Sequence, residues 1–279
     1  MTEIIQSRKN PRVLQLVALR EQRKAREQSG LFVIEGMREL ERALACKIEI
    51  VELYICPELL RNESAHKIVE QARGNAQIEI VELSRSAMEK ASYRENPEGL
   101  IAVAKTRSHQ LSTLNSQLST LHSPLYLVVE GIEKPGNLGA LLRTADSAGC
   151  DALIACSLTG DIYNPNTVRA SQGTLFSMPF ALAEKEQVAQ WLRERGVTIF
   201  ATSPAARERY FDCDFTQPTA ILLGTESTGL SDFWLKSDFA KPIGIPQKGL
   251  ADSLNVSMAG AICLFEALRQ REQLKNKNL

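Results

Sequence analysis

Three short polar segments in the C-terminal half carry the residue types that could do chemistry. They are GNLGALLR (Gly136 to Arg143), GTESTGL (Gly224 to Leu230) and IPQKGLADSLNVSMAGA (Ile245 to Ala261). Each follows an apolar run that is expected to be a strand and precedes a helix: LYLVVEG, AILLG and KPIGI. The carboxyl ends of strands in an open α/β sheet bind ligands, because helix N-termini and turn amides converge there. The segments therefore predict one composite site.

In this order and spacing the segments resemble the SpoU family, also called TrmH, of RNA ribose 2′-O-methyltransferases in the SPOUT class. The first match is Asn-Leu-Gly followed by Arg, which places Asn137 and Arg143 in the pattern. The stretch VRASQGTLFSMPF is also family-like. The remaining matched positions are Gly224, Glu226, Gly229, Leu230, Ile245, Pro246, Ser253, Leu254, Asn255, Val256 and Ser257, with Arg169, Ser171 and Gly173 in the stretch between the first two segments.

Two positions depart from the family pattern. Lys134 stands before Pro135 where many members have Asp-Pro, and Gln247 follows Ile-Pro where Met is common. Neither residue is assigned to the chemistry, so the expected effect of both departures is on which RNA is accepted.

The resemblance implies that the methyl donor is S-adenosylmethionine and that the chain methylates a ribose. The expected cofactor-binding residues are Leu223, Gly224, Glu226, Gly229, Ile245, Pro246, Ser253 and Leu254, and the expected catalytic residues are Asn137, Arg143, Glu226, Ser253 and Asn255. In the family the Arg acts on the 2′-hydroxyl. Because a guanidinium has a pKa above about 12 and rarely loses its proton, we expect Arg143 to orient the hydroxyl and stabilise the forming alkoxide, with a phosphate as a proton relay.

Each of these residues also has a purely structural interpretation. Arg143 could be an exposed helix residue, and Asn137 could be a helix N-cap instead of a contact to the ribose and to Arg143. Glu226 could simply stabilise a helix N-terminus, or it could hold Arg143 or Asn255. Ser253 could be a cap, whereas Asn255 would be a poor helix former in a first turn and is the better functional candidate.

Length and charge set the broad class. With 279 residues the chain is about two domains long. Its 33 basic and 33 acidic residues give no net charge, so attraction to RNA must be local. A basic N-terminal arm could supply it, although apolar residues at helical spacing make a solvated helix face equally consistent. The basic residues of the arm are Arg8, Lys9, Arg12, Arg20, Arg23, Lys24 and Arg26.

Cysteine and histidine usage argues against a disulfide frame or a metal site. The six cysteines show no CxxC pair and the three histidines no ligand-like spacing, so we expect reduced thiols and no metal. The chain shows neither a signal-like start nor a membrane-length apolar run, which predicts a soluble cytoplasmic protein. The absence of GxGxxG after any strand argues against a nicotinamide or flavin site.

Three regions are predicted along the chain. Residues 1–107 contain the basic arm and alternating strands and helices that resemble the family's small RNA substrate-binding domain, itself similar to ribosomal RNA-binding proteins, through FVIEG and NPEGLIAV. Residues 108–123 contain a seven-residue repeat, QLSTLNS then QLSTLHS, interpreted as a linker, with a docked helix as the alternative. Residues 124–279 form the methyltransferase domain. A mid-helix Gly260 there, which lowers helix propensity, predicts tight packing.

Alternating strands and helices after residue 124 favour a parallel sheet covered on both faces, so the fold class is α/β. The resemblance further implies a trefoil knot and a homodimer with active sites near the interface. The favoured function is S-adenosylmethionine-dependent ribose 2′-O-methylation of structured RNA, ribosomal rather than transfer RNA. The alternative is a catalytically inactive RNA-binding ribosome assembly factor. A base-methylating SPOUT enzyme is disfavoured by the Asn-Leu-Gly and Ser-Leu-Asn patterns.

Overall fold

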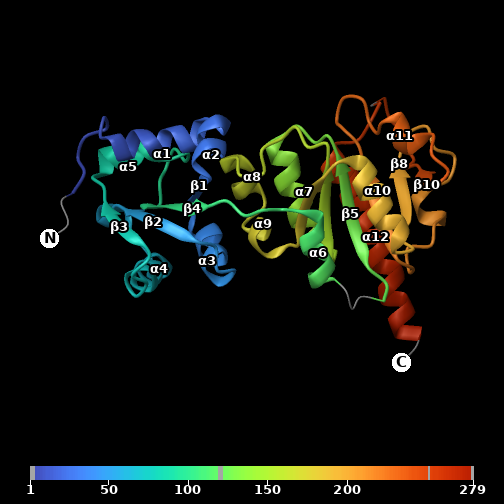
Figure 1. Ribbon diagram of the computed structural model, residues 1–279, viewed down its shortest axis with the longest axis horizontal. Coiled ribbons are helices and arrows are strands. Elements are labelled where there is room, and N and C mark those ends of the chain that lie inside the picture. The colour runs from blue at the N-terminus through green and yellow to red at the C-terminus, as the bar shows by residue number, and fades with distance from the viewer. Residues whose placement is uncertain (1–3, 119–121, 251, 278–279) are drawn as a thin grey trace. The chain divides into compact units, whose positions relative to one another are not determined.

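The protein is described by a computed structural model of residues 4–118, 122–250 and 252–277, and it forms two compact units (Figure 1). The first unit contains residues 1–107 and 161–177, and the second contains residues 108–160 and 178–279. Across the described ranges, none of the helices combines the length and apolar character needed to cross a membrane.

The first unit is built on a four-stranded mixed sheet with the order β1-β4-β2-β3. Strand β4 is antiparallel to β1 and β2, whereas β2 and β3 are parallel. The hydroxyl of Ser84 caps helix α5 by accepting a hydrogen bond from the Ala87 N–H at 3.3 Å. The elements are α1 Pro11–Glu21, α2 Arg23–Ser29, β1 Leu31–Glu35, α3 Met37–Ala45, β2 Ile50–Ile55, η1 Pro57–Leu59, α4 Glu63–Arg73, β3 Glu79–Glu82, α5 Arg85–Ala91, β4 Leu100–Lys105, α8 Pro165–Ala170 and α9 Thr174–Ser177.

The basic arm lies on α1 and α2, and several of its arginines are used inside the first unit. Arg12 lies 2.7 Å from the Glu79 carboxylate, and Arg20 donates to backbone carbonyls at the end of α5. Arg26 is 3% exposed and donates from Nε to Oδ2 of Asp161 at 2.7 Å. The guanidinium groups of these three arginines are engaged inside the first unit, and buried Arg26 does not belong to a solvated helix face.

Residues 161–177 belong to the first unit, although the sequence places them between strands of the second. The Phe32 ring centroid lies 4.4 Å from that of Tyr163. Arg42 donates to the backbone oxygen of Gln172 at 2.7 Å and packs against Gly173, which has a φ of +83°. Residues 161–177, which include Arg169, Ser171 and Gly173 of the family-like stretch, therefore pack within the first unit, although the segments on both sides of them belong to the second.

The second unit is built on a six-stranded sheet with the order β10-β8-β9-β5-β6-β7, in which all neighbouring strands are parallel. The predicted parallel α/β sheet is confirmed. Its elements are α6 Leu111–Gln117, β5 Leu125–Glu130, α7 Pro135–Ser147, β6 Ala152–Cys156, β7 Phe180–Ala183, α10 Lys185–Glu194, β8 Thr198–Thr202, η2 Tyr210–Asp212, β9 Thr219–Leu223, α11 Asp232–Leu235, β10 Ala240–Ile243 and α12 Val256–Lys277.

Helices cover both faces of this sheet. Tyr126 of β5 packs against Trp191 of α10 on one face, with ring centroids 5.3 Å apart. On the other face α12 packs along α7 and β9. A Cβ added to Gly260 of α12 would lie 2.8 Å from Leu141 and 2.9 Å from Leu223, so the predicted tight packing of Gly260 is confirmed. The close approach fixes the start of α12 at the edge of the sheet.

Helix α6 occupies most of the first copy of the repeat that was interpreted as a linker. Leu114 is fully buried in the core with α10 and β7 side chains. Asn115 accepts hydrogen bonds from Trp191 Nε1 and from Arg195, both at 2.7 Å. Residues 111–117 therefore match the alternative interpretation, a docked helix, while residues 119–121 of the second copy lie outside the described residues.

The six cysteines are free thiols, and all except Cys46 are buried.

Candidate active site

A tight loop follows β9 and forms the centre of the predicted composite site. Thr225 and Gly229 exchange backbone hydrogen bonds of 3.0 and 3.2 Å, which fold Gly224–Leu230 back on itself. A Cβ at Gly224 would lie 2.2 Å from the Gly229 carbonyl carbon. Only glycine allows the two arms of the loop to approach this closely, because a Cβ cannot occupy that space.

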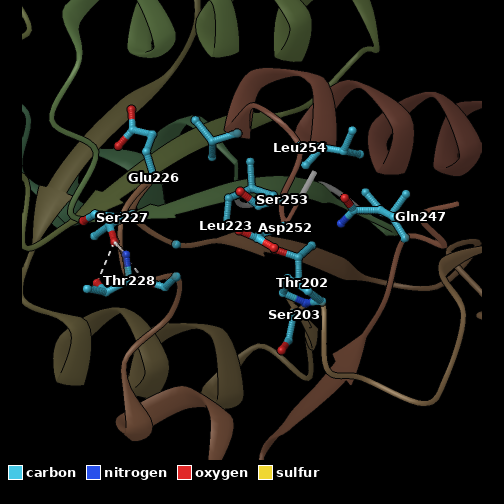
Figure 2. A pocket seen from close by; sticks show the side chains of 17 residues that line it. Thr202, Ser203, Leu223, Glu226, Ser227, Thr228, Gln247, Asp252, Ser253 and Leu254 are labelled. Carbon is cyan, nitrogen blue, oxygen red and sulfur yellow. Dashed lines mark hydrogen bonds between the residues drawn. The ribbon is translucent and has the colours of Figure 1, made fainter. Parts of the chain in front are cut away.

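A cavity of about 330 Å³ opens between this loop, the ends of β8 and β10, and the start of α12 (Figure 2). Figure 2 shows Glu226 on one side of the space and Gln247 on the other, with Leu223 and Ser253 between them. The lining residues are Thr202, Ser203, Pro204, Leu223, Gly224, Thr225, Glu226, Ser227, Thr228, Gly229, Ile245, Gln247, Asp252, Ser253, Leu254, Val256 and Ala259.

The lining combines apolar side chains, hydroxyl groups and two carboxylates, Glu226 and Asp252, and none of the described lining residues is basic. The volume falls in the usual range for small-molecule pockets, roughly 300–1,000 Å³. Oε2 of Glu226 is buried without a hydrogen-bond partner among the described residues. A small ligand that carries positive charge and hydrogen-bond donors would suit this lining.

Three of the predicted catalytic residues are joined by hydrogen bonds beside the pocket. Asn137 donates from Nδ2 to Oε1 of Glu226 at 2.7 Å, and Asn255 donates from Nδ2 to Oδ1 of Asn137 at 3.1 Å. These residues come from α7, from the loop after β9 and from the start of α12. One continuous chain of side chains therefore links all three predicted segments.

The structure decides between the alternatives for the two asparagines. Helix α7 begins at Pro135 with Lys134 at its N-cap, so Asn137 lies in the first turn and is not a cap. Asn255 caps α12 by accepting from the Ser257 N–H at 2.9 Å and from its hydroxyl at 2.6 Å. Asn255 thus uses its oxygen for the helix and its nitrogen for Asn137. Ser253 is exposed and lines the pocket instead of capping α12.

Arg143 lies two turns further along α7 and is exposed. Its guanidinium makes no hydrogen bond or ion pair with the residues that the structure describes. Glu226, which was expected to hold Arg143 or Asn255, binds Asn137 directly and reaches Asn255 only through it. The guanidinium of Arg143 is therefore available to a molecule outside the chain.

Seven of the eight expected cofactor residues line the pocket: Leu223, Gly224, Glu226, Gly229, Ile245, Ser253 and Leu254. Pro246 does not. Sequence reasoning missed Thr202 and Ser203 at the end of β8, which is parallel to β9 and ends at the same edge. They follow the apolar residues of β8, so polar residues at the carboxyl end of an apolar run were a usable signal. Asp252 and Gln247 fall inside the recognised third segment but were not assigned.

Within the described ranges, no group of three or more His, Cys, Asp or Glu residues could hold a metal ion.

Comparison with known proteins matches both units. Residues 124–265 match the SpoU rRNA methylase family, and residues 10–102 match the MRM3-like substrate binding domain. The chain is 29% identical over 270 residues to a 23S rRNA (uridine(2479)-2′-O)-methyltransferase from Streptomyces viridochromogenes, covering 94% of this chain and 91% of that protein.

Two solved structures are similar over nearly the whole chain. One is an RNA 2′-O ribose methyltransferase, with a TM-score of 0.82, 37% identity, and coverage of 97% of this chain and 100% of that one. The other is an AdoMet-bound rRNA methyltransferase from Sinorhizobium meliloti, with a TM-score of 0.84, 30% identity, and coverage of 96% and 98%.

Proposed function

Because the chain belongs to the SpoU rRNA methylase family, we propose that it transfers a methyl group from S-adenosylmethionine to a ribose 2′-hydroxyl of ribosomal RNA. The observation that carries the proposal is the hydrogen-bonded chain Asn255–Asn137–Glu226 beside a pocket of suitable lining. The names of similar proteins, which are 23S rRNA 2′-O-methyltransferases, favour ribosomal RNA as the substrate.

The pocket suits the donor by shape and charge. The donor, when bound, supplies a methyl group on a positively charged sulfonium. Glu226 and Asp252 give the lining negative charge, and Gly224 allows the loop that carries Glu226 to fold tightly beside the pocket. Apolar contacts come from Leu223, Ile245 and Leu254. Serine and threonine hydroxyls around the same space offer hydrogen bonds to the polar groups of such a ligand.

The residues at the rim orient the nucleophile. The amides of Asn137 and Asn255 are held in place by each other and by Glu226, so their orientation is set before RNA binds. Arg143 extends from the same helix as Asn137, where its guanidinium binds the ribose hydroxyl or its phosphate and stabilises the alkoxide. An arginine keeps its proton at neutral pH, so the proton leaves through phosphate or water.

A homodimer belongs to the same proposal. Met258 and Phe265, seven residues apart on α12, are 56% and 48% exposed, and Leu254 just before the helix is 38% exposed. A second copy of the chain would bury this apolar stripe, next to the active site. From the family resemblance we also propose a trefoil knot at the C-terminal end of the chain. The same resemblance supports a cytoplasmic location.

The domain of residues 1–107 binds the RNA in this proposal. Its match to a substrate binding domain supports this role. An inactive assembly factor is not favoured, because Asn137, Glu226 and Asn255 are all present and bonded to one another.

The test is single-turnover methylation by an Arg143→Ala variant. We expect the rate to fall by at least about 100-fold, the scale of losing one preorganised charge-stabilising group, while the Kd for S-adenosylmethionine stays the same. Arg193→Ala, an exposed arginine on α10 outside the pocket lining, is the matched control and should methylate normally. An Arg143→Ala variant with the wild-type rate would remove the assigned role.

A further inference from the structure

A buried carboxylate at the carboxyl end of β5 lies outside the pocket lining and the catalytic network. Glu130 is 5% exposed, and both of its oxygens accept hydrogen bonds from Ser231. The Ser231 N–H donates to Oε2 at 2.8 Å, and the Ser231 hydroxyl donates to Oε1 at 2.7 Å. Glu130 makes no ion pair within the described part of the chain. Burying a carboxylate without a cation is costly, so both donors of Ser231 are needed there.

Ser231 directly follows the loop Gly224–Leu230 and directly precedes α11. It stands at the N-cap position of α11, yet its side chain does not cap that helix. The hydroxyl that would normally bind the first turn of the helix is turned to Glu130 instead. The Ser231 hydroxyl therefore anchors the end of the loop to Glu130, and α11 has no side-chain cap from Ser231.

The residue after Glu130 contacts the other end of the same loop. Gly131 has a φ of +65°, and a Cβ added to it would lie 2.7 Å from Cγ2 of Thr225. Strand β5 is paired with β9, in the register Val129 to Leu223, so the ends of the two strands are adjacent. Glu130 and Gly131 together thus contact both arms of the loop, one through Ser231 and the other through Thr225.

We propose that Glu130 is a positioning residue that, through Ser231, holds the loop Gly224–Leu230 in the shape that binds the methyl donor. The inference rests on the proposed function, because this loop lines the pocket and carries Glu226. With Ser231 released, the arm that ends at Leu230 is free to move away from Gly224. Donor binding then has to restore the loop, so part of the binding free energy is lost.

Four variants separate this role from general destabilisation. Ser231→Ala removes one hydrogen bond and leaves Oε1 of Glu130 buried without a partner. Glu130→Met keeps a similar length and removes both acceptors. Ser231→Thr keeps the hydroxyl and is the conservative rescue. Ser237→Ala is the matched control, since it loses a 2.8 Å hydroxyl bond to the Trp234 backbone oxygen at the other end of α11.

Calorimetry and steady-state kinetics give the expected pattern. The Kd for S-adenosylmethionine should rise about tenfold in Ser231→Ala, the scale of one hydrogen bond to a charged group, and further in Glu130→Met. The KM for the donor should rise in proportion, while kcat at saturating donor changes by less than about threefold, because bound donor restores the loop. The RNA affinity of all four variants should match that of the wild type. Ser231→Thr and Ser237→Ala should also bind the donor with the wild-type Kd.

Two results would overturn the inference. One is wild-type donor affinity in Ser231→Ala and Glu130→Met proteins that thermal melting shows to be folded. The other is an equal loss of donor affinity in Ser237→Ala, which would mean that any weakening near α11 has the same effect. A wild-type protein that binds no donor would instead refute the proposed function, so the two failures can be told apart.

Discussion

Replacing Gly224 with alanine should weaken donor binding by roughly 100-fold or more without unfolding the protein. The added Cβ would lie 2.2 Å from the carbonyl carbon of Gly229, 2.3 Å from the Leu230 nitrogen and 2.5 Å from the Gly229 oxygen. All three are backbone atoms, so no side-chain rotation relieves the clash. The two arms of the loop must separate by about 1 Å to reach ordinary contact distances.

The energetic cost follows from what this separation breaks. The pair of hydrogen bonds between Thr225 and Gly229 contributes roughly 1 kcal/mol each, and overpacking at a well-packed site costs about 1–3 kcal/mol. Donor binding requires the closed loop, so this free energy is subtracted from the free energy of donor binding. At about 1.4 kcal/mol per factor of ten, the Kd rises by roughly 100-fold or more.

The assay is calorimetric titration with S-adenosylmethionine after thermal melting has shown each protein to be folded. Gly196→Ala is the control: its φ is +64° and nothing lies within 4 Å of an added Cβ, so it carries backbone strain without a clash. It should lose about 1–2 kcal/mol of stability and bind the donor normally. A Gly224→Ala protein with a Kd within threefold of the wild type would refute the loop geometry.

Three further predictions test other parts of the structure. Leu114→Ala should lower the free energy of unfolding by about 2–4 kcal/mol in urea, with exposed Ser112→Ala as the control, because Leu114 is fully buried; a negligible loss would restore the linker interpretation. Burial raises the pKa of the Cys156 thiol to about 12, against about 8.5 in an unfolded chain, so its stabilising contribution is complete below pH 8.5 and falls as the pH rises toward 12. Urea melts at pH 8 and 10 should show a decrease that Cys156→Ala reduces; an equal decrease in both proteins would contradict this assignment. Glu substitutions at Met258 and Phe265 together should give a folded monomer in sedimentation, whereas an unchanged dimer would exclude the α12 stripe as the interface.

Sequence patterns were most informative where a single local segment determines the structure. Runs of apolar residues identified most strands, and parallel strands place their carboxyl ends at one edge. Gly224, Glu226 and Leu254 consequently meet at one pocket. The resemblance supplied Asn137 and Asn255, which periodicity alone treats as ordinary helix-end residues.

Pairings over long sequence separations could not be predicted. Arg26 and Asp161 are 135 residues apart, and Arg42 binds Gln172 at a separation of 130, so no local pattern connects them. These contacts assign residues 161–177 to the first unit. A truncation at residue 105, reasonable from sequence alone, would remove their partners.

The seven-residue repeat shows that helix propensity alone did not predict a short helix. Serine and threonine disfavour a helix interior, which led to the linker interpretation of residues 108–123. Burial of Leu114 and the bonds of Asn115 outweigh that preference, because tertiary packing supplies most of the stability of a short helix. Only the arrangement of α10 and β7 reveals this packing site.

Methyl transfer to a ribose hydroxyl of ribosomal RNA can be measured directly. The most direct measurement incubates the purified protein with isotopically labelled S-adenosylmethionine and unmodified ribosomal RNA, digests the RNA to nucleosides and identifies the labelled product by mass spectrometry. We expect label in a 2′-O-methylated nucleoside, formed at least about 100-fold more slowly by Arg143→Ala. Label on a base, or no transfer by a protein that binds the donor, would contradict this expectation.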